Sequence, residues 1–460
     1  MRLTLVLSET LAGTLSDAAR AHTEHGGFVL GRLVRESDQL RFLVRAYVPV
    51  PEEHYVLQTG HEMKVRSAGF VPALALAERR GDIALWFHTH PGFGSVPLPS
   101  IHDDAVDREL AETVRIRTGQ PYYGTLIFSP AEHGAFTFTG SLDDGSEPIA
   151  FDRAWIVGDR FALVPAFNAT RLMPSSRYDR NVRAFGEGIQ STLGDLKVGV
   201  VGCGGTGSSV IEQLARLGVR NFVLLDPKQL TDTNVTRVYG SGVQDEGTPK
   251  VILAQHNILA IAPDAKVHTI EGDLLTAAHA RALTGCDVVF GCTDDDAGRL
   301  VLSRLSTFLV CPVIDCGVLI SSGEQGELVG IDGRVTTLTP GTACLVCRGR
   351  IDTRRAATQF LPSQEREVRI AEGYAPALGN REPAVVTFTT SVAAAAVNEL
   401  LERLVGFGPN PRPSEVLLRF HEREISTNRR APQPKHYCHP DAGKLGLGES
   451  KPFLELTWPG

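Results

Sequence analysis

The stretch KVGVVGCGGTGS, residues 197–208, decides the fold of the second half of this chain. A short apolar strand runs into a glycine turn, and a helix over 208–217 and a strand over 222–225 follow. Backbone N–H groups at the start of such a helix can meet phosphate oxygens. Asp226 ends the next strand, where a carboxylate can accept hydrogen bonds from ribose hydroxyls. The glycines that would let a nucleotide approach the backbone are Gly202, Gly204, Gly205 and Gly207.

The alternation of strands and helices continues beyond this unit. Further strands are expected at 267–270, 288–290 and 313–314, with helical stretches between them. The second half is therefore predicted to be α/β, with a Rossmann-like, mostly parallel, doubly wound sheet and helices on both faces.

The first half mixes strands and helices without that regularity. Strands are expected over 28–34, 40–48 and 83–87, with a helix over 71–80. This pattern predicts a mixed α+β domain. Three segments are expected, namely a first domain over 1–145, a connector with at least one strand over 146–172, and a second domain over 173–460.

Composition excludes some classes of function. The chain has 460 residues, 42% hydrophobic and 22% charged, with a formal net charge of −7. This balance gives no general reason to bind nucleic acid or an anionic membrane. The apolar run at the N-terminus is too short for a signal peptide, and the helical stretch 392–405 carries charged residues. Because its eight cysteines do not form a secreted disulfide pattern, the protein is expected in the cytoplasm.

Three residues in the first half have the spacing of a catalytic metal site. His88 and His90 lie two apart at the end of a predicted strand, so both imidazoles can face one metal ion. Such a pair alone is weak evidence for a metal site. Asp103, in the first turn of the next predicted helix, adds a carboxylate, and three protein ligands with an open position for water are typical of a catalytic zinc.

This pattern, together with Ser100 and an upstream Glu24, resembles the JAMM metalloproteases, a family of zinc deubiquitinases and related peptidases. The resemblance implies a cytidine-deaminase-like fold, Glu24 as the general base that takes a proton from zinc-bound water, and Ser100 as the group that steadies the oxyanion. Ser100 could equally be a helix N-cap that forms a capping box with Asp103, and the two roles are compatible. The interval from His90 to Ser100 is longer than is usual in that family.

Three further motifs in the second half resemble the ThiF-type adenylyltransferases, which include the ubiquitin-activating enzymes. They are Asn234-Val-Thr-Arg237, Gly247-Thr-Pro-Lys250 and Thr293-Asp-Asp-Asp-Ala-Gly-Arg299. The resemblance covers about 175–440 and implies ATP as substrate, with Asn234, Arg237 and Lys250 around its phosphates and Asp294 holding Mg²⁺. Val238 replaces the usual glutamine of the first motif.

The same resemblance bears on subunit state. Arg180 lies in a predicted entry helix, and in that family the equivalent arginine reaches the ATP phosphates of a neighbouring subunit, which implies a homodimer. A dehydrogenase would also satisfy the glycine turn and Asp226, but no redox chemistry needs two cations beside the phosphates.

The cysteines predict a second zinc site and exclude one step. Cys344 and Cys347 match the first half of the family's structural zinc site, and Cys438 supplies one residue of the other half. The fourth ligand stays open between His436 and His439. Activating enzymes that form a thioester keep a cysteine in the crossover segment, but the sequence has none between Arg348 and Tyr437. Adenylation is therefore expected rather than thioester transfer.

Together the two resemblances imply a bifunctional enzyme that acts on the C-terminus of a small ubiquitin-like protein. One domain would adenylate the terminal glycine, and the other would hydrolyse a peptide or isopeptide bond just beyond it. Such a pairing is expected in bacterial modification systems, in defence against phage and together with a conjugating enzyme. The alternatives are activation of a sulfur-carrier protein for thiocarboxylate-dependent biosynthesis, and a scaffold that binds a ubiquitin-like protein without turnover.

Overall fold

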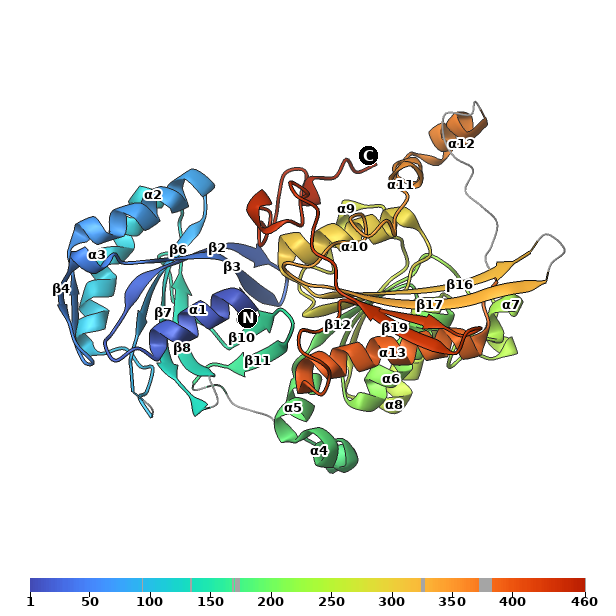
Figure 1. The fold of residues 1–460 in the computed structure, drawn as a ribbon, viewed down its shortest axis with the longest axis horizontal. Coiled ribbons are helices and arrows are strands. Elements are labelled where there is room, and N and C mark those ends of the chain that lie inside the picture. The colour runs from blue at the N-terminus through green and yellow to red at the C-terminus, as the bar shows by residue number, and fades with distance from the viewer. Residues whose placement is uncertain are drawn as a thin grey trace. The chain divides into compact units, whose positions relative to one another are not determined.

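The computed structural model describes residues 1–92, 94–132, 135–167, 169, 174–323, 327–371 and 383–459. The chain divides into two compact units, drawn in Figure 1. The first comprises Met1–Arg171 with Gly446–Gly448, and the second comprises Leu172–Leu445 with Glu449–Gly460. Among the described residues, no helix has the length and apolar character needed to cross a bilayer.

The first unit is built on one mixed sheet, in the order β11-β10-β1-β3-β2-β6-β7-β8-β9. Its strands are β1 (Arg2–Ser8), β2 (Gly26–Arg35), β3 (Gln39–Pro49), β6 (Ile83–Thr89), β7 (Tyr123–Pro130), β8 (Phe136–Asp143), β9 (Ile149–Ala150), β10 (Arg153–Val157) and β11 (Phe161–Pro165). A separate hairpin joins β4 (Tyr55–Gln58) to β5 (Met63–Val65). The helices are α1 (Glu9–Ala19), α2 (Val71–Arg80) and α3 (Ile101–Thr118).

Alternation along the strands creates two cores, one on each face of this sheet. On β6, Leu85 and Phe87 join the core that packs against α1. Ala84 and Trp86 point the other way, into the core that packs against α2 and α3. His88 continues this second series, so β6 directs it toward the face that α3 covers.

The segment 146–172, expected to be a connector, contributes β9, β10 and β11 to the sheet of the first unit. β10 pairs in parallel with β1, with Thr4 opposite Arg153 and Ser8 opposite Val157. The first unit thus continues beyond residue 145 and includes these three strands. The expectation of at least one strand in this segment is confirmed by β11, whereas the two-residue β9 and the five-residue β10 carry too little periodic pattern to stand out in the sequence.

The second unit has a sheet in the order β14-β13-β12-β15-β16-β17-β18-β19. The strands are β12 (Lys197–Val201), β13 (Asn221–Leu225), β14 (Lys266–Ile270), β15 (Val288–Gly291), β16 (Val313–Ser322), β17 (Leu328–Leu338), β18 (Glu415–Arg419) and β19 (Glu424–Asn428). The helices are α4 (Asp179–Phe185), α5 (Glu187–Asp195), α6 (Gly205–Leu217), α7 (Asp232–Val235), α8 (Lys250–Ile261), α9 (Ala277–Arg281), α10 (Asp296–Leu309), α11 (Thr353–Gln359), α12 (Ser363–Ala371) and α13 (Val386–Val405).

The prediction of a mostly parallel sheet holds for β14, β13, β12, β15 and β16, which run parallel to one another. It is wrong for β17, β18 and β19, which extend the sheet antiparallel from β16. Helices cover both faces, with α6, α8 and α13 on one and α9 and α10 on the other (Figure 1). The sheet therefore has a parallel part, which carries the glycine turn, and an antiparallel extension.

Candidate functional sites

The glycine turn of the second unit is shaped by close packing. Gly202 follows β12 with φ of +90°, a conformation that glycine adopts at little cost. A Cβ on Gly207 would lie 1.7 Å from the carbonyl oxygen of Gly202, so only glycine fits there. Helix α6 begins at Gly205 rather than at the expected Ser208. A Cβ on Gly204 would meet nothing within 4 Å, which leaves that position open to a ligand.

Asp226 is fixed by the turn that it faces. One carboxylate oxygen accepts a hydrogen bond from the backbone N–H of Cys203 (2.7 Å), and the other accepts one from the backbone N–H of Lys228 (2.8 Å). The carboxylate thus ties the end of β13 to the glycine turn at the edge of the cavity. The thiol of Cys203 is fully buried, and burial raises its pKa well above the ordinary value. Cys203 is a small core residue.

Cationic and anionic side chains from separate segments meet at this edge. Lys250, at the start of α8, is buried, and burial lowers its pKa against the opposing attraction of Asp226. Arg237 is anchored because its guanidinium donates to the carbonyl oxygen of Thr233 (2.7 Å). Lys228, which the sequence did not single out, lies with its Nζ 4.0 Å from a carboxylate oxygen of Asp294.

These residues line a cavity of about 1420 Å³. The predicted site residues along its wall are Gly202, Gly204, Gly205, Asp226, Asn234, Arg237, Lys250 and Asp294. Gly207 lies under the turn, and Arg180 is exposed on α4; neither is among the described residues that line the cavity. Asp273, Leu274 and Leu275, which follow β14, line it as well and were not predicted.

Two acidic neighbours of Asp294 have structural roles. Asp295 is the N-cap of α10 and accepts a hydrogen bond from the backbone N–H of Gly298. Asp296 accepts one from the backbone N–H of Asp352 (3.1 Å). These two residues therefore cap and support the start of α10 and the neighbouring backbone.

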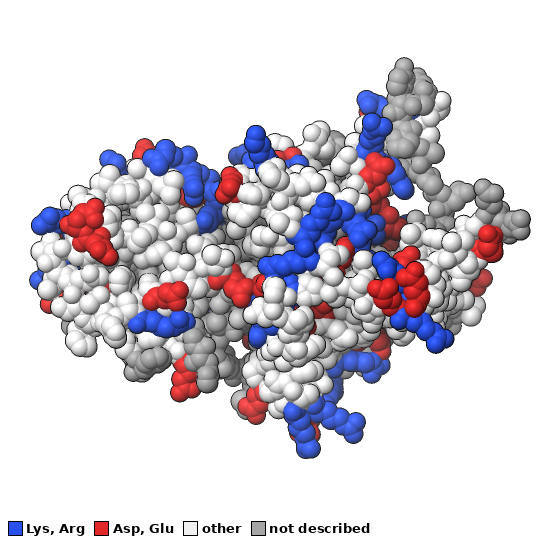
Figure 2. Space-filling view, in the orientation of Figure 1, with Lys and Arg blue, Asp and Glu red and all other residues white. Residues whose placement is uncertain are grey.

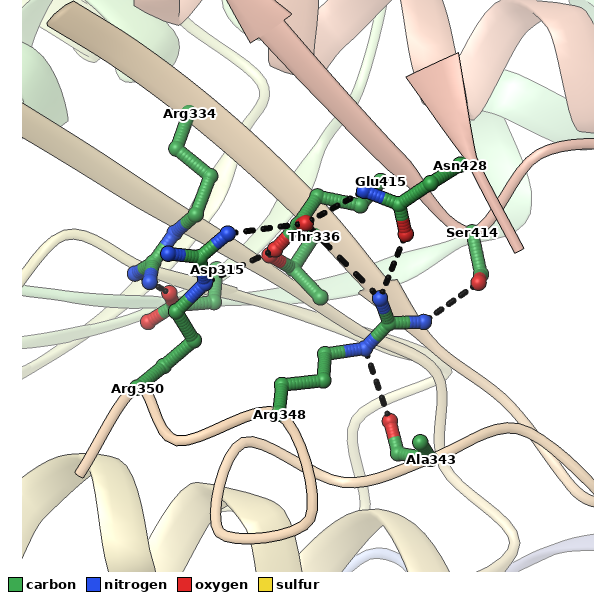
Figure 3. Close-up of polar contacts among 9 residues, drawn as sticks. All are labelled: Asp315, Arg334, Thr336, Ala343, Arg348, Arg350, Ser414, Glu415 and Asn428. Atoms are coloured by element: carbon green, nitrogen blue, oxygen red, sulfur yellow. Dashed lines mark hydrogen bonds and ion pairs between the residues drawn. The ribbon is translucent and has the colours of Figure 1, made fainter. Parts of the chain in front are cut away.

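A network of arginines and buried carboxylates forms the other wall of the cavity (Figure 3). Arg334 donates to Asp315 (2.6 Å), and Arg299 lies with its Nε 3.5 Å from the other oxygen of the same carboxylate. Glu415 accepts two hydrogen bonds from Arg350, at 3.1 and 3.0 Å. In the space-filling view of Figure 2, Lys and Arg side chains form a band over the second unit. A chain with net negative charge thus has a locally basic surface.

A third cluster unites the cysteines of the second unit. Ligand atoms of Cys344, Cys347, His436 and Cys438 all lie within 4.8 Å of one another. His436 Nδ1 lies 3.3 Å from the sulfur of Cys347 and 3.2 Å from that of Cys438. His439 instead accepts a hydrogen bond from the backbone N–H of Asp441. The geometry therefore selects His436 as the fourth member, and three sulfurs with one imidazole nitrogen suit a structural zinc.

The predicted metal residues of the first unit also converge. His88, His90 and Asp103 present ligand atoms within 4.8 Å of one another. His88 Nε2 lies 3.5 Å from one oxygen of Asp103, and His90 Nε2 lies 4.0 Å from the other. Neither ring nitrogen of the buried His88 has a hydrogen-bond partner among the described residues. Two imidazoles and a carboxylate with an unsatisfied buried nitrogen fit a divalent zinc ion.

Ser100 has the capping role that the sequence allowed. Its side chain accepts a hydrogen bond from the backbone N–H of Asp103 (3.2 Å), and Asp103 accepts one from the N–H of Ser100 (2.7 Å). This capping box fixes the Asp103 carboxylate at the start of α3. Burial opposes ionisation of Asp103, but its contacts with His88 and Ser100 outweigh burial and hold its pKa well below the ordinary value.

Glu24 reaches this cluster because of strand pairing. It lies just before β2, where Gly26 pairs with His88 on β6. The hairpin β4–β5 holds its backbone. The N–H of Glu24 donates to the carbonyl oxygen of Thr59 (2.7 Å), and the side-chain amide of Gln58 donates to the carbonyl oxygen of Glu24 (2.9 Å).

The carboxyl group of Glu24 opens into a cavity of about 870 Å³. Burial raises its pKa above the ordinary value, against the attraction of His90 and His88. A carboxylate with a raised pKa is better matched to taking up a proton near neutral pH. His90, Ser100 and Asp103 line the same cavity, together with the apolar side chains Met63, Val65, Phe70, Trp86, Val106 and Leu110.

Taken with its parallel strands and glycine turn, the second unit is a doubly wound α/β domain with a cation-lined cavity at the carboxyl edge of its sheet. Its family can be stated more closely. The sequence model of the ThiF family matches residues 178–439, more than half of the chain, and the protein belongs to this family.

Similar proteins match part of the chain. The SAMP-activating enzyme E1 of Haloferax volcanii is 28% identical over 184 residues, which cover 40% of this chain and 63% of that protein. The molybdopterin-synthase adenylyltransferase of Escherichia coli is 28% identical over 186 residues, 40% of this chain and 71% of the relative. The sulfur carrier protein ThiS adenylyltransferase of the same organism is 28% identical over 151 residues, which cover 33% of this chain and 56% of that protein.

A solved structure has a similar chain. Escherichia coli MccB, crystallised with ATP, is 18% identical to this protein with a TM-score of 0.45, over 56% of this chain and 73% of that one.

Proposed function

We propose that the second unit adenylates the C-terminal carboxylate of a small ubiquitin-like protein. The observation that carries this proposal is the cavity edge where Lys250, Arg237 and Asp294 meet beside an open Gly204. An oxygen of the carboxylate attacks the α-phosphorus of ATP, the bond to the bridging oxygen breaks, and pyrophosphate leaves with the electron pair. Lys250 and Arg237 would offset the charge of the phosphates. Mg²⁺ held by Asp294 would neutralise the departing pyrophosphate.

The relatives support a protein carboxylate as the group that is activated. Two of them are named as adenylyltransferases of molybdopterin synthase and of a sulfur carrier protein, and a third as a SAMP-activating enzyme E1. Modification by a ubiquitin-like protein is the function that we propose first. The second candidate is sulfur-carrier activation, which the name of one relative, the sulfur carrier protein ThiS adenylyltransferase, favours.

The acyl group would leave the enzyme without an enzyme thioester. No cysteine occurs in the sequence between Arg348 and Tyr437. The adenylate would therefore pass to a nucleophile from outside, such as the thiol of a conjugating enzyme or a persulfide. We further propose a homodimer in which the exposed Arg180 reaches the phosphates bound by the partner subunit.

For the first unit we propose zinc-dependent hydrolysis of the bond just beyond the same C-terminus, as in the JAMM metalloproteases. The convergence of His88, His90 and Asp103 beside Glu24 supports it. Glu24 would take the proton from water, and zinc would lower the pKa of that water. Both units would then recognise one tail, which explains why they share a chain.

The exchange of labelled pyrophosphate into ATP tests the adenylation. Exchange should depend on a ubiquitin-like or sulfur-carrier protein with a free C-terminal glycine, and Lys250→Ala should reduce it by roughly a hundredfold or more because a buried charge beside the phosphates is lost. Arg216→Ala, a change at an exposed residue of α6, is the control. If the wild-type protein catalyses no exchange with any such partner, the proposal is wrong.

A further inference from the structure

The antiparallel extension of the sheet offers one face to the cavity. Paired residues of adjacent strands share a face, and the pairs here are Gly317 with Arg334, Leu319 with Asp332, Arg334 with Leu417, and Asp332 with Arg419. All six of these residues line the cavity, and we call this the sheet side. The opposite face is covered by α13, because a Cβ on Gly333 would meet Val392 at 2.5 Å. The cavity therefore continues from the nucleotide turn along an open face.

Two guanidinium groups meet on the sheet side above a glycine. A Cβ on Gly317 would lie 3.2 Å from an Nη2 of Arg334 and 3.6 Å from that of Arg299. Both arginines share one carboxylate, Asp315, which is completely buried. Because Gly317 has no side chain, nothing from its own strand covers the two cations.

Buried polar atoms are left without hydrogen-bond partners at this point. Arg299 and Arg334 share the carboxylate of Asp315, and Arg299 is also attracted by Asp294, Asp295 and Asp296. Their Nε atoms and one oxygen of Asp315 are buried without a hydrogen-bond partner among the described residues. The neighbouring Glu415 is already occupied by Arg350 and Arg348 (Figure 3). Buried guanidinium N–H groups without an acceptor are costly, so an anion that accepts hydrogen bonds from these two side chains would be stabilised.

We propose that Arg299 and Arg334, around Gly317, form a carboxylate subsite for the acyl substrate. This inference rests on the proposed adenylation and assigns its substrate a negative charge at this place. A planar carboxylate can accept two parallel hydrogen bonds from one guanidinium group, so this pairing orients the bound carboxylate as well as stabilising it.

The position of the subsite favours the acyl substrate over the nucleotide. Asp315 lies on β16, two strand positions from β12, which is roughly 10 Å. The phosphates would bind at the glycine turn that follows β12. An extended peptide covers roughly 10 Å in three residues. The carboxylate is therefore either the C-terminus itself before reaction, or an acidic side chain about three residues upstream of the glycine that reacts.

Three peptides distinguish these sources when added to the full-length protein saturated with a non-hydrolysable ATP analogue. They are acetyl-Gly-Gly with a free carboxylate, acetyl-Gly-Gly amide, and acetyl-Asp-Gly-Gly-Gly amide, in which the aspartate lies three residues upstream of the last glycine. Saturation-transfer NMR measures binding of each. Binding of the first alone identifies the C-terminus, and binding of the third identifies an acidic side chain. The uncharged amide should not bind.

Arg334→Gln should weaken binding of the carboxylate peptides by roughly tenfold or more, because a charge-assisted hydrogen bond is lost. Arg334→Lys keeps the charge without the fork and should lie in between. Arg216→Gln should bind as the wild type does. Unchanged affinity for the ATP analogue shows that the variants are folded. Equal peptide binding by wild type and Arg334→Gln, or no carboxylate binding to the wild type, overturns the subsite. Failure of the wild type to bind the analogue would instead count against the proposed function.

Discussion

The α-carbon of Gly207 faces the carbonyl oxygen of Gly202 so closely that an added Cβ would lie 1.7 Å from it. Gly204, two residues along the turn from Gly202, faces open space. The two positions therefore separate the packing role of the turn from its binding role.

Gly207→Ala should lower the melting temperature of the second unit by several degrees or abolish its folding, because α6 must move away from the turn. Gly204→Ala should leave the melting temperature within about a degree of the wild type and still weaken ATP binding, because the methyl group occupies the space for the phosphates. Calorimetry and ATP titration check the pair. Equal melting temperatures for both variants would contradict this division of roles.

His88→Ala should remove the metal ion of the first unit, because the remaining His90 and Asp103 supply too few ligands. The zinc content of the purified protein should fall by one ion per chain, and the zinc of the cysteine cluster should remain. His61→Ala is the control, since His61 lines the same cavity outside the ligand cluster. Unchanged zinc content in the His88 variant would contradict the site.

Glu24→Gln should retain zinc and lose hydrolysis by roughly a hundredfold or more, because the amide cannot accept a proton from water. The test compares zinc content with cleavage of a ubiquitin-like protein extended at its C-terminus. Normal cleavage by this variant would refute the assigned base.

His436→Ala should lower the melting temperature of the second unit and release zinc, because it removes a ligand from the cysteine cluster. His439→Ala removes only a side chain that accepts a hydrogen bond at the start of a short turn, and about 1 kcal/mol or less should be lost. Zinc content and calorimetry distinguish the two histidines. If His439→Ala released the metal and His436→Ala did not, the ligand assignment would be reversed.

Glu415 should stabilise the second unit only above acidic pH. Burial alone would raise its pKa, but hydrogen bonds from Arg350 and Asn428 and the charge of Arg348 outweigh burial and lower the pKa to about 2. The group is deprotonated in the folded state, so its contribution is full above its ordinary pKa of 4.5 and is lost as pH falls toward 2. This contribution is roughly 3 kcal/mol at most.

The variant Glu415→Gln tests this linkage. It should melt several degrees below the wild type at pH 7, and the difference should shrink steadily between pH 4.5 and pH 3. Comparison at each pH removes the effect of zinc release, which both proteins share. A difference that stays constant over this range would show that Glu415 does not titrate as its contacts require.

Local motifs explain why much of the site could be predicted. The glycine turn, the pair His88 and His90, and the ligands Cys344 and Cys347 each lie within a few residues of one another, where spacing alone determines which side chains share a face. The helix over 71–80 was also predicted with its observed bounds, because Gly81 ends it with a left-handed conformation.

The residues that were missed depend on contacts between distant segments. β18 follows β17 only after three helices, and its five residues carry no pattern that fixes a partner strand. The pair of Arg334 with Asp315 arises from the register of β17 against β16 and has no signature in the sequence. Lys228 is a single exposed lysine until the fold brings it beside Asp294. His436 and His439 were equivalent in the sequence, and only the turn between them separates their roles.

The hairpin β4–β5 supports the backbone of Glu24 through Gln58 and Thr59, and it also supplies Met63 and Val65 to the wall of the cavity. A polypeptide that presses on this wall therefore presses on the support of the group assigned as the base. We therefore expect a polypeptide seated in this cavity to affect the alignment of Glu24 through the hairpin.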